Sequence, residues 1–292
     1  MKIVVIDKKD LRVHIKAEAL KFDRQSVPLR SMELLILNHR TTIETADILR
    51  LTRQGIHVLI VAYLNRHFAL IQAAGAHGSD LKRVQYGALE RRETIARDLL
   101  EKKFHEHARH LERHGLHIDA EAPTRQLHAA QSVDEMMGIE GAFARAYFQE
   151  YFALFHRSIQ KGKRTKRPPK DPVNALLSYW YSLYYYQITT QLLTFGFEPG
   201  IGYLHAPFRD HNALASDLLE LFRAQINEAV YRVFASGKLE QEHFAFHRGG
   251  VYLRYEGRKK VWAEYLELVR LFQPLLNGHI AHLRRSIHAP DS

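Results

Sequence analysis

Short apolar segments rich in β-branched residues dominate the first quarter of the chain. They read KIVVI (2–6), RVHIKAEALKF (12–22), MELLIL (32–37), IHVLIVA (56–62) and HFALIQAA (67–74). Segments of this length and composition are typical of strands. Between the third and fourth, Thr41 and Glu44 have capping-box spacing and Gly55 suits a helix end. We therefore expect a small β-rich N-terminal domain over residues 1–75 with one inserted helix.

The hydrophobic period becomes helical after the segment GAHGS, residues 75–79. Helical patterns cover residues 79–115, 132–156 and 171–196, begin again near Asn212, and continue from 258 toward the end. Ser132 with Glu135 has capping-box spacing, and Asp171-Pro172 favours a helix start. HFAFHRGGVYLRYEG (243–257) predicts a hairpin turning on Gly249-Gly250. The fold class is therefore α+β, with a larger all-α C-terminal domain over residues 76–292.

The composition indicates the cellular compartment of the protein and excludes several kinds of site. The 292 residues are 46% hydrophobic and include no cysteine, which excludes disulfides, thiolate metal sites and cysteine nucleophiles. The chain shows neither a signal-peptide core nor a run of about 18 apolar residues. We expect a cytoplasmic protein with no membrane partner.

The charge balance favours a polyanionic partner. Lysine and arginine number 42 against 32 acidic residues, a formal net charge of +10 with a pI near 9.6. Nucleic acid is the first expectation and an anionic membrane surface the second, while an ordinary basic surface is the alternative.

Three places carry candidate metal-binding chemistry. Glu140 stands among small residues in GIEGAFARAYF, His205 stands in GYLHAPF, and Asp217, Glu220 and Arg223 follow at spacings of three. Two carboxylates and an imidazole suit a divalent ion that keeps positions open for phosphate oxygens and water. A solvated glutamate, a structural histidine and a surface ion-pair stripe are the ordinary alternatives, and spacing alone leaves both possibilities open.

A basic segment and an aromatic run lie between these places. Lys161, Lys163, Arg164, Lys166 and Arg167 belong to KGKRTKRPPK (161–170), whose two prolines disfavour a helix. The segment is either a phosphate-contacting loop or a solvated linker. YWYSLYYY (179–186) offers stacking faces for bases, but its helical spacing favours a core position for most of it.

Several segments in this order resemble the CRISPR-associated endonuclease/integrase, the Cas1 family. They are NHRTTIETADILRLTRQGIHVLIVA, MGIEGAFARAYF, RTKRPPKDPVNALLSYWYSLYYYQ, GFEPGIGYLHAPF and NALASDLLELFR. The resemblance implies a sandwich-like N-terminal dimerisation domain and a helical catalytic domain. It further implies Mg²⁺- or Mn²⁺-dependent cutting and joining of double-stranded DNA, with spacers inserted into the CRISPR array by transesterification. The implied partners are a second copy of the chain and a dimer of the small Cas2 protein.

The same resemblance implies roles for individual residues. Glu140, His205 and Glu220 would be the catalytic metal ligands, Asp217 a supporting acid, Arg223 a phosphate-facing residue and Asn174 a neighbour of the site. Ala224 and Asn227 stand where the family often has proline and aspartate. The last metal ligand is aspartate in some members of the family and glutamate, Glu220, in this chain. A non-enzymatic DNA-binding scaffold and a zinc hydrolase of small substrates are the competing interpretations.

Overall fold

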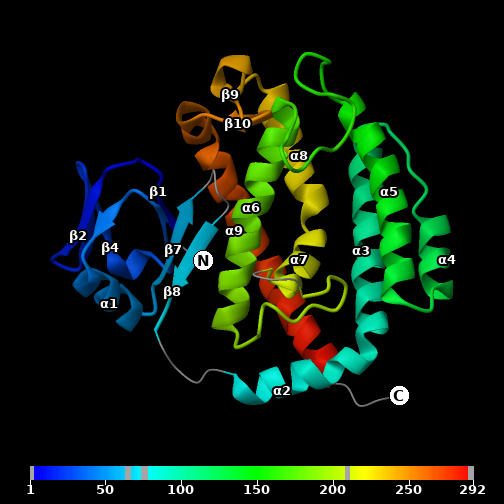
Figure 1. Cartoon of the computed structure of the whole chain (residues 1–292), viewed down its shortest axis with the longest axis horizontal. Helices are drawn as coiled ribbons and strands as arrows, with labels where there is room; N and C mark the ends of the chain where they lie inside the picture. The colour runs from blue at the N-terminus through cyan, green and yellow to red at the C-terminus, as the bar shows by residue number, and fades with distance from the viewer. Residues whose placement is uncertain (1–2, 63–66, 74–77, 208–210, 289–292) are drawn as a thin grey trace. The chain divides into compact units, whose positions relative to one another are not determined.

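The structure, a computed structural model, describes residues 3–62, 67–73, 78–207 and 211–288. Its internal contacts divide the chain into two units, residues 1–77 and 78–292, each of which is shown in Figure 1. The division falls inside the GAHGS segment.

Within its described residues, the first unit contains two four-stranded sheets and one α-helix. One sheet has the order β1-β5-β7-β8, in which β1, β5 and β7 are parallel and β8 is antiparallel; the other has the order β4-β3-β2-β6. The strands are β1 (Ile3–Ile6), β2 (Arg12–Lys16), β3 (Ala19–Phe22), β4 (Gln25–Pro28), β5 (Leu34–Asn38), β6 (Thr42–Ile43), β7 (His57–Ala62) and β8 (His67–Ile71). Helix α1 spans Thr45–Arg53, and a 3₁₀ turn, η1, spans Leu29–Ser31.

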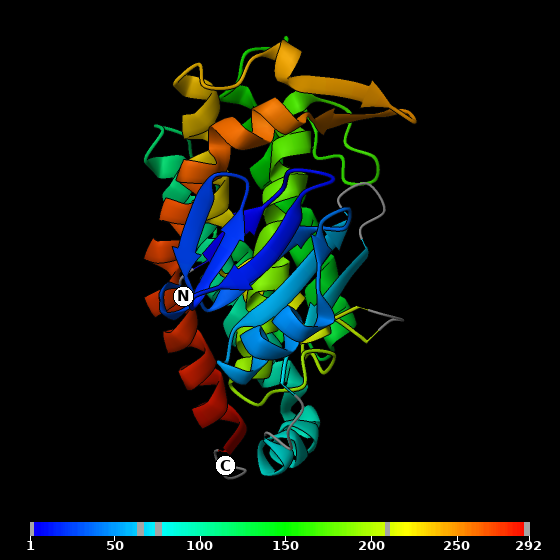
Figure 2. The same cartoon turned by 90° about the vertical axis from the view of Figure 1, so that its left-hand side faces the viewer.

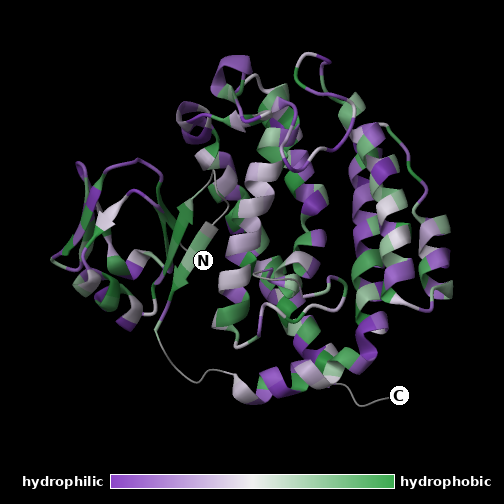
Figure 3. Cartoon of the chain, viewed as in Figure 1, coloured by the Kyte–Doolittle hydropathy of each residue, from purple (hydrophilic) through white to green (hydrophobic). Residues whose placement is uncertain are grey.

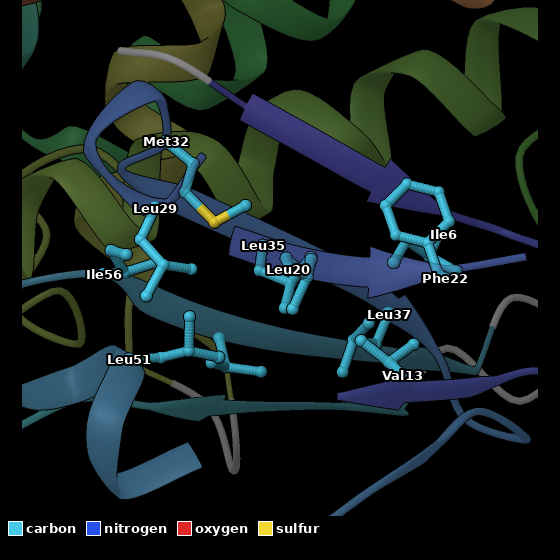
Figure 4. Packing of buried hydrophobic residues seen from close by; sticks show 11 residues of the cluster. Ile6, Val13, Leu20, Phe22, Leu29, Met32, Leu35, Leu37, Leu51 and Ile56 are labelled. Carbon is cyan, nitrogen blue, oxygen red and sulfur yellow. The ribbon is translucent and has the colours of Figure 1, made fainter. Parts of the chain in front are cut away.

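Both sheets contribute to one hydrophobic core. Val13 and Leu20 come from the second sheet, whereas Leu35 and Leu37 come from the first (Figure 4). Val58, also in the first sheet, belongs to the same core, and all five residues are almost completely buried. Burial of apolar side chains from two facing sheets is the main stabilising contribution in such a unit. The expected β-rich fold with one inserted helix is therefore confirmed.

Three local details differ from expectation. The segment 12–22 is a hairpin of β2 and β3, because Ala17 and Glu18 both adopt positive φ angles, 51° and 53°, as in a two-residue turn. Strand β4 was not anticipated. The capping box at Thr41 was wrong, because the next two residues form β6, and the helix starts after Glu44 without a side-chain cap bond.

The second unit is mostly helical (Figures 1 and 2). Its helices are α2 (Ser79–Gly87), α3 (Arg92–Glu112), α4 (Glu121–Ala129), α5 (Val133–Ala153), α6 (Pro172–Thr194), α7 (Ala213–Glu220), α8 (Arg223–Ala235) and α9 (Tyr255–His288), with 3₁₀ turns η2 (Ala88–Arg91) and η3 (Gln241–His243). Helices α3, α4 and α5 pack against one another, and α3 also contacts α7 and α8. The expected larger helical domain is confirmed, although α4 and the break between α2 and α3 were not anticipated.

Local sequence signals explain several boundaries in this unit. Ser132 accepts the backbone N–H of Glu135 at 3.3 Å to cap α5, and Asp171 accepts that of Asn174 at 2.7 Å to cap α6. Strands β9 (Phe244–His247) and β10 (Gly250–Leu253) form the expected hairpin. Its turn lies one residue earlier than predicted, at Arg248 and Gly249, which both have positive φ.

Helix α6 is the centre of this unit's core. Trp180, Tyr181, Tyr184 and Tyr186 are at most 6% exposed, which agrees with the core interpretation of the aromatic run. Hydrophobic and hydrophilic residues alternate along the surrounding helices (Figure 3). Among the described residues, none of the helices combines the length and apolarity that crossing a membrane requires.

Candidate active site

Two predicted carboxylates meet at one buried lysine. Glu140 lies on α5 and Glu220 ends α7, while Lys103 lies on α3 between them. The Lys103 ammonium contacts the Glu140 carboxylate and lies 2.6 Å from Oε2 of Glu220. The Lys103 and Glu220 side chains are only 3% and 5% exposed. Packing of α3 against α5 and α7 therefore brings together acids that are 80 positions apart in the chain.

The charges in this cluster stabilise one another. Burial alone would raise the pKa of Glu220, but the charges of Arg223 and Lys103 outweigh burial and hold that pKa far below its usual range. Burial likewise opposes the charge of Lys103, and the two glutamates together raise its pKa. Glu220 is therefore an anion and Lys103 a cation at neutral pH.

His205 is held beside the cluster by Asp217. The His205 Nδ1–H donates to Oδ1 of Asp217 at 2.8 Å, and the backbone N–H groups of Tyr203, Leu204 and His205 also donate to the Asp217 carboxylate, at 2.6–3.1 Å. This pattern fixes both the loop and the ring and leaves Nε2 as the nitrogen not bound to Asp217. Burial lowers the pKa of His205, but the Asp217 hydrogen bond and the charges of Asp217 and Glu220 produce a net increase.

The loop that carries His205 is packed tightly on the start of α7. A Cβ atom added to Gly202 would lie 2.7 Å from Cβ of Ala213 and 2.8 Å from the carbonyl oxygen of His205. Glycine is therefore required for this close approach. Gly138, two residues before Glu140, is different. No described neighbour lies within 4 Å of a Cβ atom added to it, so the space beside this glycine is open.

Arg223 closes the cluster on another side. Its Nε lies 2.8 Å from Oε2 of Glu220, and its guanidinium lies over the ring of Tyr181, 4.5 Å from the ring centroid. The guanidinium is thus fixed by an ion pair and by a cation–π contact. Asn227, where the family often has aspartate, is fully buried and binds the hydroxyls of Tyr181 and Tyr147.

The basic segment forms an ordered loop, and Asn174 organises it. Oδ1 of Asn174 accepts from the Thr165 backbone N–H at 2.9 Å and from the Arg164 guanidinium at 2.8 Å, and its Nδ2 donates to the Lys163 carbonyl. Arg164 also donates to Ser178 at 3.1 Å. Asn174 therefore positions the loop, and Arg164 points inward as part of its support.

The other predicted DNA-contact residues lie on the exposed side of this loop. Lys161, Lys163, Lys166 and Arg167 are all exposed. The charges of Arg223, Glu220 and Glu140 act on Lys166, so the loop lies within electrostatic range of the carboxylates. The loop adds positive charge beside the cluster, as a phosphate-binding surface requires.

Sequence reasoning missed Lys103, and it placed the aromatic run with Tyr181 in the core without anticipating the contact of Tyr181 with Arg223. A signal for Lys103 exists, because it lies between Leu99, Leu100, Phe104 and His107 on the buried face of α3. In the described part of the chain, one group of histidine and carboxylate side chains has three ligand atoms within 4.8 Å of one another, and it is His110, His114 and Glu228. Glu140, His205 and Glu220 do not form such a group, since Lys103 separates the two carboxylates.

Sequence comparison links the chain to one family. The family model described as CRISPR associated protein Cas1 matches residues 3–267. A protein of Thermodesulfovibrio yellowstonii named CRISPR-associated endonuclease Cas1 1 is 30% identical, and the alignment covers 98% of this chain and 97% of that protein.

Solved structures show the same fold. A Cas1 protein from Thermotoga maritima superposes with a TM-score of 0.90 at 20% identity over the whole of both chains. A casposase bound to integration product gives 0.82 at 21% identity, over 92% of this chain and 83% of that one. A chain of a Cas6-RT-Cas1–Cas2 complex gives 0.81 at 21% identity, over 98% of this chain and 35% of that one.

Proposed function

The chain belongs to the Cas1 family of CRISPR-associated proteins, and we propose that it is a metal-dependent DNA endonuclease/integrase. One observation carries the proposal: Glu140 and Glu220, from distant helices, converge on a single buried cation beside a histidine that Asp217 orients. An ordinary surface stripe of acids would not be buried in this way. A protein that only binds DNA would not need two buried carboxylates beside an oriented histidine.

The residues fit a divalent cation. Both carboxylates already bind one positive charge at a common point, and the donor set of two carboxylates and one imidazole suits Mg²⁺ or, with the imidazole, Mn²⁺. Glu140, His205 and Glu220 would hold the ion, and the Lys103 ammonium would have to withdraw from the two carboxylates to admit it. Such an ion supplies Lewis-acid polarisation of a phosphodiester and charge neutralisation at the leaving oxygen.

The surrounding residues position the DNA and the ligands. Asp217 holds the His205 ring through Nδ1 and thereby directs Nε2 away from itself. Arg223, fixed by Glu220 and Tyr181, presents a positive charge for a phosphate. The exposed cations of the loop at 161–167 extend that charge along the DNA backbone, with Asn174 holding the loop in place.

The proposed reaction is transesterification. The 3′-hydroxyl of a spacer strand attacks a phosphodiester of the repeat DNA, one P–O bond forms, another breaks, and the displaced 3′-oxygen takes up a proton. The number of phosphodiesters is conserved, so no high-energy cofactor is required. Water in place of the hydroxyl gives cleavage, which accounts for an endonuclease activity in the same site.

The proposed partners follow from the family. We expect a homodimer formed mainly by the first unit, double-stranded spacer and repeat DNA, and a Cas2 dimer. Solved structures with the same fold include a Cas6-RT-Cas1–Cas2 complex and a casposase bound to integration product. The net charge of +10 supports the DNA partner.

Strand transfer tests the proposal. Purified protein is incubated with a branched DNA, and with a spacer duplex plus a repeat plasmid and Cas2, in Mg²⁺, Mn²⁺ or EDTA. Joining should require the metal and should be lost in Glu140→Ala and His205→Ala, but not in Asp134→Ala, which removes an exposed acid from the first turn of the same helix as Glu140. If the protein bound DNA but joined no strands even with Cas2 present, the result would support the non-enzymatic DNA-binding scaffold. Zn²⁺-dependent hydrolysis of small substrates, with DNA unaffected, would support the zinc hydrolase.

A further inference from the structure

A second group of ligand-type side chains joins α3 to α8 and shares no residue with the Glu140–Glu220 cluster. His110 lies near the end of α3, and His114 follows four residues later, in the turn after the helix ends at Glu112, with its ring centroid 5.3 Å from that of His110. Glu228 reaches them from α8. Two histidines held this close together, with a glutamate from elsewhere, supply the two imidazole nitrogens and one carboxylate of a His₂Glu zinc site.

The distances are close to those a tetrahedral ion requires. Ligand atoms about 2.0–2.1 Å from a zinc ion lie roughly 3.3 Å from one another. Oε2 of Glu228 lies 3.3 Å from Nε2 of His110 and 2.6 Å from Nε2 of His114. The His114–Glu228 contact, a hydrogen bond in the structure, would have to widen by less than about 1 Å, and all three ligand atoms lie within 4.8 Å of one another.

The atoms of these side chains that would face away from an ion are already held. Nδ1 of His110 lies 2.9 Å from the Tyr147 hydroxyl, and Oε1 of Glu228 accepts from Nε of Arg232 at 2.6 Å. Such outer contacts fix the ring and carboxylate orientations in metal sites. They leave Nε2 of His110 and Oε2 of Glu228 directed at one point.

Nε2 of His110 gives an independent indication. The His110 side chain is only 2% exposed, and within the described residues this nitrogen has no partner that satisfies hydrogen-bond geometry. Oε2 of Glu228, 3.3 Å away, is a weak ion-pair partner of this nitrogen, and an ion held between the two would satisfy both atoms.

A small cavity provides room for the remaining coordination positions. It measures about 190 Å³, and its lining includes His110, Glu228, Gln225 and Arg113. Water or a side-chain oxygen can therefore complete a four-coordinate ion. We propose that His110, His114 and Glu228 bind one Zn²⁺ ion, which fastens α3 to α8.

Zinc stoichiometry of the full chain tests this inference. The protein is loaded with ZnCl₂, desalted and measured by mass spectrometry, and its affinity is determined by competition with a chromophoric chelator. His114→Ala and Glu228→Gln should each lose one zinc equivalent, or bind it at least tenfold more weakly. His105→Ala should not, because His105 lies on the same helix but is 41% exposed and pairs with Glu121 instead. Glu140→Gln should keep this equivalent too, which separates the site from the proposed catalytic one.

Cobalt substitution provides a readout independent of activity. Co²⁺ at this site should give a visible spectrum that disappears in Glu228→Gln. That variant retains a hydrogen-bonding side chain of nearly the same size, so it remains informative if His114→Ala does not fold. Equal zinc content in wild type, His114→Ala and Glu228→Gln would overturn the inference. Loss of zinc in Glu140→Gln alone would do the same.

Discussion

The ammonium of Lys103 lies 2.6 Å from the Glu220 carboxylate at a place where neither side chain is more than 5% exposed. Removal of one partner from a buried ion pair usually costs about 3–5 kcal/mol, because the other charge stays buried without compensation. Because Arg223 still pairs with Glu220 when Lys103 is lost, Lys103→Met should destabilise the protein by no more than about this amount in EDTA, as measured by urea denaturation. Mn²⁺ or Mg²⁺ should restore much of the loss, since an ion can take the place of the ammonium.

Lys102→Met is the matched control for this experiment. Lys102 is the preceding residue on α3, but its ion pair with Asp98 is exposed. Such a pair contributes less than about 1 kcal/mol. A Lys103→Met protein as stable in EDTA as Lys102→Met would contradict the role of Lys103 as internal counter-ion.

Asp217 is expected to act by positioning His205. Asp217→Asn keeps the size of the side chain but loses the charge that accepts the His205 ring and three backbone N–H groups. Loss of such an outer contact typically lowers metal affinity or activity by about 10–100-fold. The rate of strand transfer, measured against metal concentration, should fall accordingly. Asp98→Asn, which alters an exposed acid, should keep the wild-type rate.

The basic loop should divide into two classes of residue. Neutralising the exposed Lys161, Lys163, Lys166 and Arg167 should weaken DNA binding and flatten its salt dependence, by roughly 0.9 in log–log slope per lost phosphate contact. Arg164→Gln should instead lower thermal stability, because Arg164 donates to Asn174 and Ser178 within the protein. Fluorescence anisotropy over a salt series measures the slopes. If the variant with all four residues neutralised kept the wild-type salt dependence of DNA binding, the loop would be a solvated linker that does not contact DNA.

His107 should make stability depend on pH. Burial, with a smaller effect of the Lys103 charge, lowers the pKa of His107 to about 3, whereas the unfolded chain has its ordinary value near 6.5. The unfolded state therefore takes up a proton below about pH 6.5 and the folded state does not, so stability falls with acidification. At pH 5 this group should cost about 2 kcal/mol relative to pH 7.

His107→Gln should remove that part of the pH dependence. His105→Gln is its control, because His105 makes the same contact to the carbonyl four residues earlier but is more exposed. Urea denaturation at pH 5 and pH 7 compares the three proteins. Equal pH dependence in wild type and His107→Gln would rule out the effect.

The fold was largely predictable where local signals agree with packing. Apolar strand segments, the caps at Ser132 and Asp171 and the aromatic core of α6 were all anticipated from their patterns. The split of segment 12–22 was not, since Ala17 and Glu18 are unusual residues for positive φ and the bend depends on strand pairing. The hairpin turn at 248–249 was misplaced by one residue because Arg248, like those two, adopts positive φ without being glycine.

The sequence predicted which residues belong to the candidate active site but not how they are arranged in space. The ordered motifs singled out Glu140, His205 and Glu220, and their assignment as ligands stays a prediction. Nothing in the spacing indicated that a lysine from α3 would lie between the two carboxylates. Lysine in a charged helical stretch usually belongs to a solvated face, and only the tertiary packing of three helices makes Lys103 internal. The same packing joins His110 to Glu228, 118 positions later in the chain.

Helix α3 carries Lys103, His107 and His110 along one buried face. Each residue of an α-helix advances the side-chain direction by about 100°. Insertion or deletion of a single residue between 103 and 110 would therefore turn one of these groups away from its partners, even if every helix still formed. This stretch should tolerate many point substitutions on its outer face but no change in length, so homologous chains should be alignable here without gaps.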